Sequence, residues 1–328
     1  MAVRGRIFVL ALLVLALVVI TPAFAAERQK LGDANWTGPL ETSNPNVIPK
    51  NHLYIETYFV MEQDYATYDN KGNKTSRPVV NDYQSVTLFA YGITNKFNLQ
   101  FLPAFDGAEA LKGSLPGSSS HGLEVDNLTV RTPYQFYSYK EGKAWPSFTI
   151  SPGFIAPIET GSVNSSNPWT PWFGLWAQRP FWMPGGRILR VRFNENFYFP
   201  VQENHAASAC PTGSNLAALG GACSLSGGKY MKTLIGAEYS LTKHWVPAWD
   251  FYWKWGAETT YKGVNGFNPG SANGANVFNS SMQRLVIDPA LEYNFTGNVG
   301  MICGVELTVS GRNTTSYVAP QCALQVFK

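Results

Sequence analysis

Charged residues are scarce in this chain, and histidine and cysteine are rarer still. Asp, Glu, Lys and Arg together make up 14% of the 328 residues, and histidine and cysteine occur four times each. The histidines are His52, His121, His205 and His244. They lack the spacing of metal ligands, so we expect no metal site and no cofactor. His205 and Ser208 share one polar segment but have no third residue to orient them, so we do not expect an enzyme.

Clusters of positive charge are absent as well. The chain has 25 lysines and arginines against 22 aspartates and glutamates, spread along its length. Without a block of lysine or arginine, the chain has no surface that could follow a line of phosphates. Nucleic acid is therefore not an expected partner.

Long hydrophobic runs are confined to the beginning of the chain. An apolar run from Ile7 to Ile20 follows two arginines and precedes the small residues Ala23 and Ala25. This pattern predicts a secretory signal peptide at residues 1–25, cleaved after Ala25 or Ala26. The run is shorter than the roughly 20 residues that a spanning helix needs, and no later run is longer. Any part that spans a membrane must therefore consist of strands.

The stretch from Met282 to Phe327 shows a pattern of period two. Apolar residues occupy most odd positions up to Asn294, whereas Arg284, Asp288 and Glu292 occupy even ones. Such alternation predicts a strand with two different faces. Regularly spaced charges opposite a continuous hydrocarbon face indicate either a barrel with a wet interior and lipid outside, or a soluble sheet with one solvated face.

Twelve segments of this kind divide the rest of the chain, and the lengths of their connections distinguish the two alternatives. The segments are 52–63, 82–92, 97–105, 125–139, 146–157, 169–182, 186–199, 229–241, 245–261, 282–295, 298–309 and 315–327. Short turns alternate with long polar connections, which are 64–81, 106–124, 158–168, 200–228 and 262–281. Bacterial outer-membrane barrels have short periplasmic turns and long outer loops, whereas a soluble sandwich has no reason to sort its loops by length.

We therefore predict an all-β protein, a transmembrane antiparallel up-and-down β-barrel of about 12 strands at residues 51–328. Residues 26–50 are expected to form an N-terminal periplasmic segment, and both termini are expected in the periplasm. Aromatic residues make up 14% of the chain, which suits a wall that contacts lipid. Trp145, Trp182 and Trp245 fall at short turns, where an interfacial aromatic girdle is expected.

The polar faces of the predicted strands supply the side chains expected to line the lumen and the solute path. They carry both signs of charge and are Arg131, Arg190, Arg192, Lys232, Glu238, Asp250, Lys254, Glu258, Arg284, Asp288 and Glu292. Arg190 and Arg192 are two apart on one strand, so they project to the same side about 6 to 7 Å apart. If acids neutralise them, the lumen is a structural lattice; if not, it favours anionic or polarised aromatic solutes. Glu195 falls on the apolar side of the same strand and does not fit the pattern.

The four cysteines allow three pairings. Cys210 and Cys223 bracket twelve residues of one long loop. Because an exported chain meets an oxidising compartment, we predict a disulfide between them. Cys303 and Cys322 are equidistant from the predicted turn of the last hairpin, so whether they bond depends on the strand register.

Several short segments resemble a known family of outer-membrane transporters. Residues 36–39 (WTGP), 41–47 and 52–58 resemble the N-terminal signature of the phenol meta-pathway degradation family, and Tyr91 to Pro103 (YGITNKFNLQFLP) resembles its strand-turn-strand motif. Residues 126–139, 145–157 and 289–313 are similar to its later strands. The resemblance implies a one-domain outer-membrane barrel linked to uptake of small, often aromatic molecules, and it implies no catalytic or ligand-binding residues.

These observations predict a channel or transporter in the outer membrane of a Gram-negative bacterium. It would pass small solutes, aromatic or hydrophobic ones among them, through a narrow lumen of mixed charge. Its expected partners are the lipid bilayer and the solute, and the sequence identifies no protein partner. The alternative is a structural or surface-interaction protein that acts through its outer loops. A lumen filled by inward-folded loops or by Arg and Glu side chains would favour this alternative.

Overall fold

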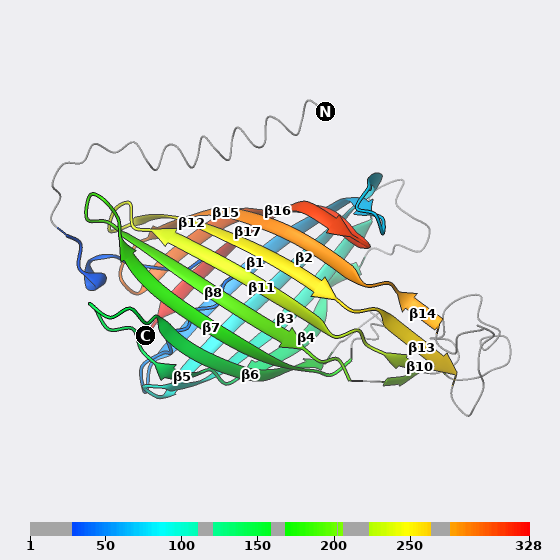
Figure 1. Cartoon of the computed structure of the whole chain (residues 1–328), viewed down its shortest axis with the longest axis horizontal. Coiled ribbons are helices and arrows are strands. Elements are labelled where there is room, and N and C mark those ends of the chain that lie inside the picture. The colour runs from blue at the N-terminus through cyan, green and yellow to red at the C-terminus, as the bar shows by residue number, and fades with distance from the viewer. Residues whose placement is uncertain (1–27, 111–120, 159–167, 202, 206–222, 264–275) are drawn as a thin grey trace.

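The computed structural model describes residues 28–110, 121–158, 168–201, 203–205, 223–263 and 276–328. Its main sheet is a barrel of antiparallel strands (Figure 1). The strands are β1 (Leu53–Tyr68), β2 (Lys74–Thr94), β3 (Phe97–Ala110), β4 (His121–Arg131), β5 (Tyr134–Tyr137), β6 (Ser147–Pro157), β7 (Thr170–Trp182), β8 (Ile188–Tyr198), β11 (Tyr230–Tyr239), β12 (Trp245–Gly256), β15 (Met282–Asn294), β16 (Val299–Arg312) and β17 (Thr314–Phe327).

The barrel is closed by pairing between its first and last strands. β1 pairs with β17 on one side and with β2 on the other. β4 and β5 both pair with β3 and β6, so they are two halves of one strand. The described residues thus form the predicted antiparallel barrel of twelve strands, which leaves no free sheet edge. Within the same residues, no helix is long and apolar enough to cross a membrane.

Side chains alternate between the two faces of the wall, as the period of two predicted. On β12, Asp250 and Tyr252 are buried, whereas Phe251 and Trp253 are exposed on the outside. Trp145 and Trp245, predicted for the aromatic girdle, are also exposed near short turns. An outer surface this rich in large apolar side chains is stable in contact with lipid and unfavourable in water.

Some strands extend further than the sequence pattern indicated. The predicted loop 64–81 is largely strand, because β1 continues to Tyr68 and β2 begins at Lys74. Most side chains from Lys74 to Pro78 are exposed, so this part of the hairpin has no apolar face that alternation could reveal. Asp69 closes the turn, where its hydrogen bonds with Asn73 lower the pKa of its carboxyl.

A second, smaller sheet lies beyond one end of the barrel. It contains β9 (Glu203–His205), β10 (Cys223–Ser226), β13 (Thr259–Gly263) and β14 (Asn276–Asn279) in the order β14-β13-β10-β9. The predicted long loops at 200–228 and 262–281 therefore contain short strands. The C-terminus and the first described residues lie at the opposite end, where the short turns are (Figure 1). Both ends of the described chain therefore share one side of the barrel.

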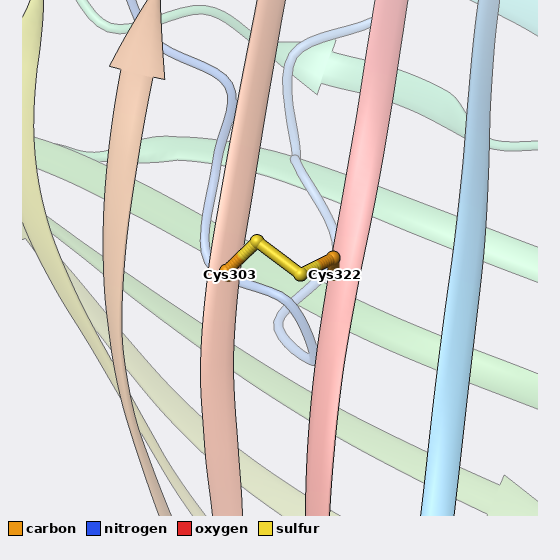
Figure 2. Close-up of a disulfide and its surroundings, with 2 residues drawn as sticks. All are labelled: Cys303 and Cys322. Atoms are coloured by element: carbon orange, nitrogen blue, oxygen red, sulfur yellow. A yellow bond between two sulfur atoms is a disulfide. The ribbon is translucent and has the colours of Figure 1, made fainter.

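A disulfide joins the last two strands. Cys303 on β16 and Cys322 on β17 are direct partners in the register, with Cα atoms 4.1 Å apart, and their sulfurs are bonded (Figure 2). The register that the sequence left open therefore permits this bond. Cys210 lies outside the described residues, so its predicted pairing with Cys223 stays a prediction.

Candidate functional site

The interior of the barrel contains part of the N-terminal segment. The backbone N–H groups of Thr37 and Gly38 donate to Glu292 over 2.8 and 3.3 Å, and that of Glu41 donates to Asp250 over 2.9 Å. We expected residues 26–50 in the periplasm, but residues 35–48 run inside the wall. We call these residues the lumen segment. The sequence pattern did not reveal this position, because most of these bonds use the segment's backbone rather than its side chains.

Both ends of the N-terminal segment are held at the short-turn end of the barrel. The backbone N–H of Gln29 donates to Gly186, and its side chain donates to Ser240. After the lumen segment, the backbone N–H of Lys50 donates to Asn95 in the turn between β2 and β3. The lumen segment therefore enters and leaves through the same end. It is a folded-back loop inside the barrel.

Glycines in the wall leave room for the lumen segment. A β-carbon at Gly236 would lie 2.7 Å from the hydroxyl of Thr42, and one at Gly304 would lie 2.8 Å from Leu40. At Gly300, a β-carbon would overlap the hydroxyl of Thr37. Glycines at inward-facing strand positions were thus a signal in the sequence that something packs against the inside of the wall.

Arg190 and Arg192 converge on one buried acid. Arg190 donates two bonds of 2.6 Å to Glu238, and Arg192 lies 3.2 Å from the same fully buried carboxylate. Arg192 also donates to the carbonyl of Thr42 over 3.0 Å, and Arg190 lies over the ring of Trp36 at 4.3 Å. The two arginines therefore bind an acid and the lumen segment here. Their predicted contact with a solute stays a prediction.

Three further predicted lumen residues also touch the lumen segment. Lys232 forms an ion pair with Glu41, and Asp250 accepts from the hydroxyl of Thr42. Arg131 donates to the hydroxyl of Ser43 over 3.2 Å. The network of ion pairs and hydrogen bonds in the lumen thus includes side chains of the lumen segment as well as those of the wall.

The remaining predicted lumen residues make their contacts with the wall and not with the lumen segment. Asp288 accepts from Gln321 over 2.8 Å. Lys254 lies over the ring of Tyr230 at 5.0 Å, and Arg284 lies over the ring of Tyr317 at 4.7 Å. Glu258 is exposed and follows the end of β12 at Gly256. Outside the lumen, Glu195 accepts from its cross-strand neighbour Thr233 over 2.7 Å, which explains how an acid is tolerated on the outer face.

The sequence pattern did not single out the aromatic residues of the lumen. Trp172 and Trp176 are buried on the inner face of β7, and their rings are 6.3 Å apart. Trp172 is 5.7 Å from Tyr198, which stacks on Tyr230 at 4.3 Å. These rings form a row along the inside of the wall toward the outer mouth. Tyr198 lies an even number of residues from Arg190 on β8, and Tyr230 lies two residues from Lys232 on β11, so the sequence placed both rings on the polar, inward face. We had attributed the aromatic residues to lipid contact.

Three carboxylates also come together on β1 and β2. Oxygens of Glu62, Asp64 and Asp82 all lie within 4.8 Å of one another, and Arg77 forms an ion pair of 2.7 Å with Asp64. Glu62 and Asp64 are two apart on β1, and Asp82 on β2 joins them only through the β1–β2 register, which places it opposite Glu62. Sequence spacing alone could not show the cluster.

Two cavities lie on the outer side of the lumen segment. One, of about 490 Å³, opens at the outer mouth beside Tyr230, Lys254 and Met282. The other, of about 190 Å³, lies deeper, and Glu41 and Ser43 of the lumen segment form part of its lining. A third cavity, of about 90 Å³, lies between the lumen segment and the wall toward the short-turn end, beside Tyr54 and Ala90. The lumen segment therefore divides the interior and has cavities on both of its sides.

Comparison with solved structures supports the fold. The chain is similar to the COG4313 outer membrane channel from Pseudomonas putida F1, with a TM-score of 0.66 and 12% sequence identity, covering 88% of this chain and all of that one. The transport unit of the autotransporter AIDA-I from Escherichia coli has a TM-score of 0.43 at 11% identity, covering 88% and 92% of the two chains. A variant of the TodX monoaromatic hydrocarbon channel has a TM-score of 0.41 at 10% identity, covering 87% and 93%. The last two are too distant to support an argument.

Two further comparisons used the sequence. No family model matches it, and no curated protein matches it. The resemblance to the phenol meta-pathway degradation family therefore stays a prediction. The pairing of the strands, the outward apolar face and the first of these comparisons agree on one point: the chain has the fold of a bacterial outer-membrane β-barrel.

Proposed function

We propose that this protein is an outer-membrane channel for small solutes, and that the lumen segment must move for a solute to pass. The observation that carries the proposal is the shape of the interior. One cavity opens at the outer mouth and a second lies deeper, and residues 35–48 cross the interior beyond them with contacts to β8, β12 and β15. In this proposal, the described structure is the closed state of the channel.

The kind of contacts that hold the lumen segment supports the proposal that it can be displaced from the lumen. They are mainly hydrogen bonds and ion pairs, such as those of Thr37 with Glu292 and of Glu41 with Lys232. Each such bond contributes about 0.5–3 kcal/mol net, because water replaces it when it breaks. The wall, in contrast, is held by continuous strand pairing and by the Cys303–Cys322 disulfide. The segment can therefore leave without unfolding the barrel.

The class of solute is also part of the proposal. The sequence resembles a family linked to uptake of small aromatic molecules, and the Pseudomonas putida protein with the same fold is an outer membrane channel. The resemblance supports small aromatic or hydrophobic solutes, and the shared fold supports a channel. The mixed charge of the lumen supports solutes that also carry a polar group.

One observation favours a second candidate, a structural or surface-interaction protein with a permanently closed lumen. The arginine–glutamate lattice and the lumen segment fill the interior at the short-turn end. In that case the lattice serves the stability of the barrel, and the outer sheet of β9, β10, β13 and β14 carries the function.

Recording currents in planar bilayers distinguishes the two candidates. The purified protein is compared with a variant that weakens the lumen segment, Glu41→Gln with Thr42→Val, which removes the ion pair to Lys232 and the hydroxyl bond to Asp250. Glu258→Gln, on an exposed residue, is the control. We expect discrete steps that open more often in the double variant. Absence of conductance in all three proteins, each verified as a folded barrel by its heat-dependent gel migration, would favour the structural candidate.

A further inference from the structure

The deeper cavity has the lining of a ligand site. We propose that it binds a small planar organic anion, a single ring that carries one carboxylate, and we call it the ring pocket. The inference rests on the proposed channel function, of which it specifies the solute. Four kinds of observation carry it: the size of the cavity, its aromatic wall, its charge and its contact with the lumen segment.

The size and the apolar lining fit a single ring. The cavity has a volume of about 190 Å³, and Leu102, Ile155 and Leu234 form part of its wall. An apolar cavity of about 150 Å³ is large enough to bind benzene. The ring pocket therefore has room for a benzene ring and one small substituent.

The aromatic wall favours a flat solute. Trp172 and Tyr198 both line the ring pocket, and their rings are 5.7 Å apart with an angle of 21° between their planes. Tyr198 continues the row to Tyr230, which lines the cavity at the outer mouth. A planar ring can exchange one stacking partner for the next along such a row. The row thus connects the mouth to the ring pocket.

The charged groups favour an anion. Two cations, Arg131 and Lys232, and one carboxylate, Glu41, line the ring pocket. Glu41 is paired with Lys232. Among the described residues, Arg131 has no carboxylate within 4.0 Å, and its hydrogen bonds go to the neutral side chains of Gln100 and Ser43. Glu56 interacts with Arg131 from the neighbouring cavity on the short-turn side, but it does not line the ring pocket. The lining of the ring pocket itself therefore has one positive charge in excess, which a single carboxylate would balance.

An unsatisfied donor lies in the same lining. The indole N–H of Trp172 has no hydrogen-bond partner in the described part of the chain, although the residue is only 6% exposed. A buried donor without a partner is unfavourable, and an oxygen of a bound solute can supply one.

The floor of the ring pocket belongs to the lumen segment, so a bound anion would lie next to the Glu41–Lys232 ion pair. The solute's carboxylate beside Arg131 then lies close to the carboxylate of Glu41, and the two like charges repel each other. Replacing Glu41 by glutamine removes this repulsion, so Glu41→Gln should bind the anion more tightly than the native protein.

The test is isothermal titration calorimetry on the full-length folded barrel in detergent at neutral pH. Benzoate is the probe, benzyl alcohol the neutral analogue and acetate the analogue without a ring. We expect benzoate to bind at least about tenfold more tightly than either analogue, because benzyl alcohol lacks the charge that bonds to Arg131 and acetate lacks the ring that stacks on the aromatic wall. Arg131→Gln should weaken benzoate about tenfold and leave benzyl alcohol unchanged.

Arg284→Gln is the matched control, because Arg284 is another lumen cation but does not line the ring pocket. Leu102→Trp provides a second variant that keeps every charge and narrows the cavity, and it should weaken the binding of benzoate and of benzyl alcohol alike. Equal affinity for benzoate and benzyl alcohol, or equal losses in Arg131→Gln and Arg284→Gln, would overturn the proposal. Conductance of the same preparations is measured in parallel. A conducting protein that does not bind benzoate refutes the ring pocket alone, whereas a protein that binds benzoate and never conducts refutes the channel.

Discussion

A single side chain added inside the wall should open the barrel if the lumen segment is the barrier. Gly300 on β16 faces inward, and a β-carbon there would occupy the space of the Thr37 hydroxyl. Gly300 does not need a positive φ, so valine suits its strand backbone. We therefore predict that Gly300→Val leaves the barrel folded and expels Thr37 and Gly38 from their places.

The magnitude follows from the bonds that are lost. Thr37 and Gly38 donate to Glu292 over 2.8 and 3.3 Å, and the hydroxyl of Thr37 donates to Asn294 over 3.2 Å. Two bonds to a carboxylate at about 1.5 kcal/mol each and one neutral bond at about 1 kcal/mol give about 4 kcal/mol. That free energy corresponds to roughly a thousandfold shift toward the displaced segment.

Single-channel recording in planar bilayers measures the shift as open probability. Gly297→Val is the control, because Gly297 is exposed in the preceding turn and a β-carbon there would make only an ordinary contact of 3.5 Å with Asn35. We expect frequent openings in Gly300→Val and native behaviour in Gly297→Val. If a folded Gly300→Val barrel stays as closed as the native protein, the lumen segment is not the barrier.

Two further predictions concern stability. Replacing both Cys303 and Cys322 by serine should lower the free energy of unfolding by about 3 kcal/mol, since the bond closes a loop with a sequence separation of 19; urea titration of the native and double-serine proteins measures this, and an unchanged midpoint would contradict it. Glu238→Gln should cost about 3–5 kcal/mol in the same titration, because Arg190 and Arg192 lose their buried counter-charge. The exposed Glu258→Gln should stay within about 0.5 kcal/mol of the native protein, and equal effects of the two substitutions would refute the role given to Glu238.

The membrane-facing part of the fold was readable from the sequence. On β15, Val286, Asp288 and Glu292 are buried while Leu285 and Leu291 are exposed, as the alternation predicted. Lipid imposes this pattern, because every outward side chain must be apolar and every backbone group must be paired within the wall. Beyond the membrane this constraint ends, which is why the extensions of β1 and β2 were taken for a loop.

The interior was readable only in part. Glu238 was among the possible partners of Arg190, but its selection depends on the β8–β11 register, which places the two residues opposite each other. The lumen segment left no periodic signal, because its backbone N–H groups meet acids from strands far away in sequence, such as Asp250 and Glu292. Hydrogen bonds to the backbone do not depend on residue type, so a sequence pattern cannot report them.

Because the lumen segment continues directly into β1, its displacement does not remove it from the protein. It is an intramolecular ligand on a short tether, and such a ligand has an effective concentration on the order of millimolar. If the protein is the channel proposed above, a solute that holds it open must compete with this local concentration for the same contacts. We then expect a weakly bound solute to keep the path open only while it is abundant outside.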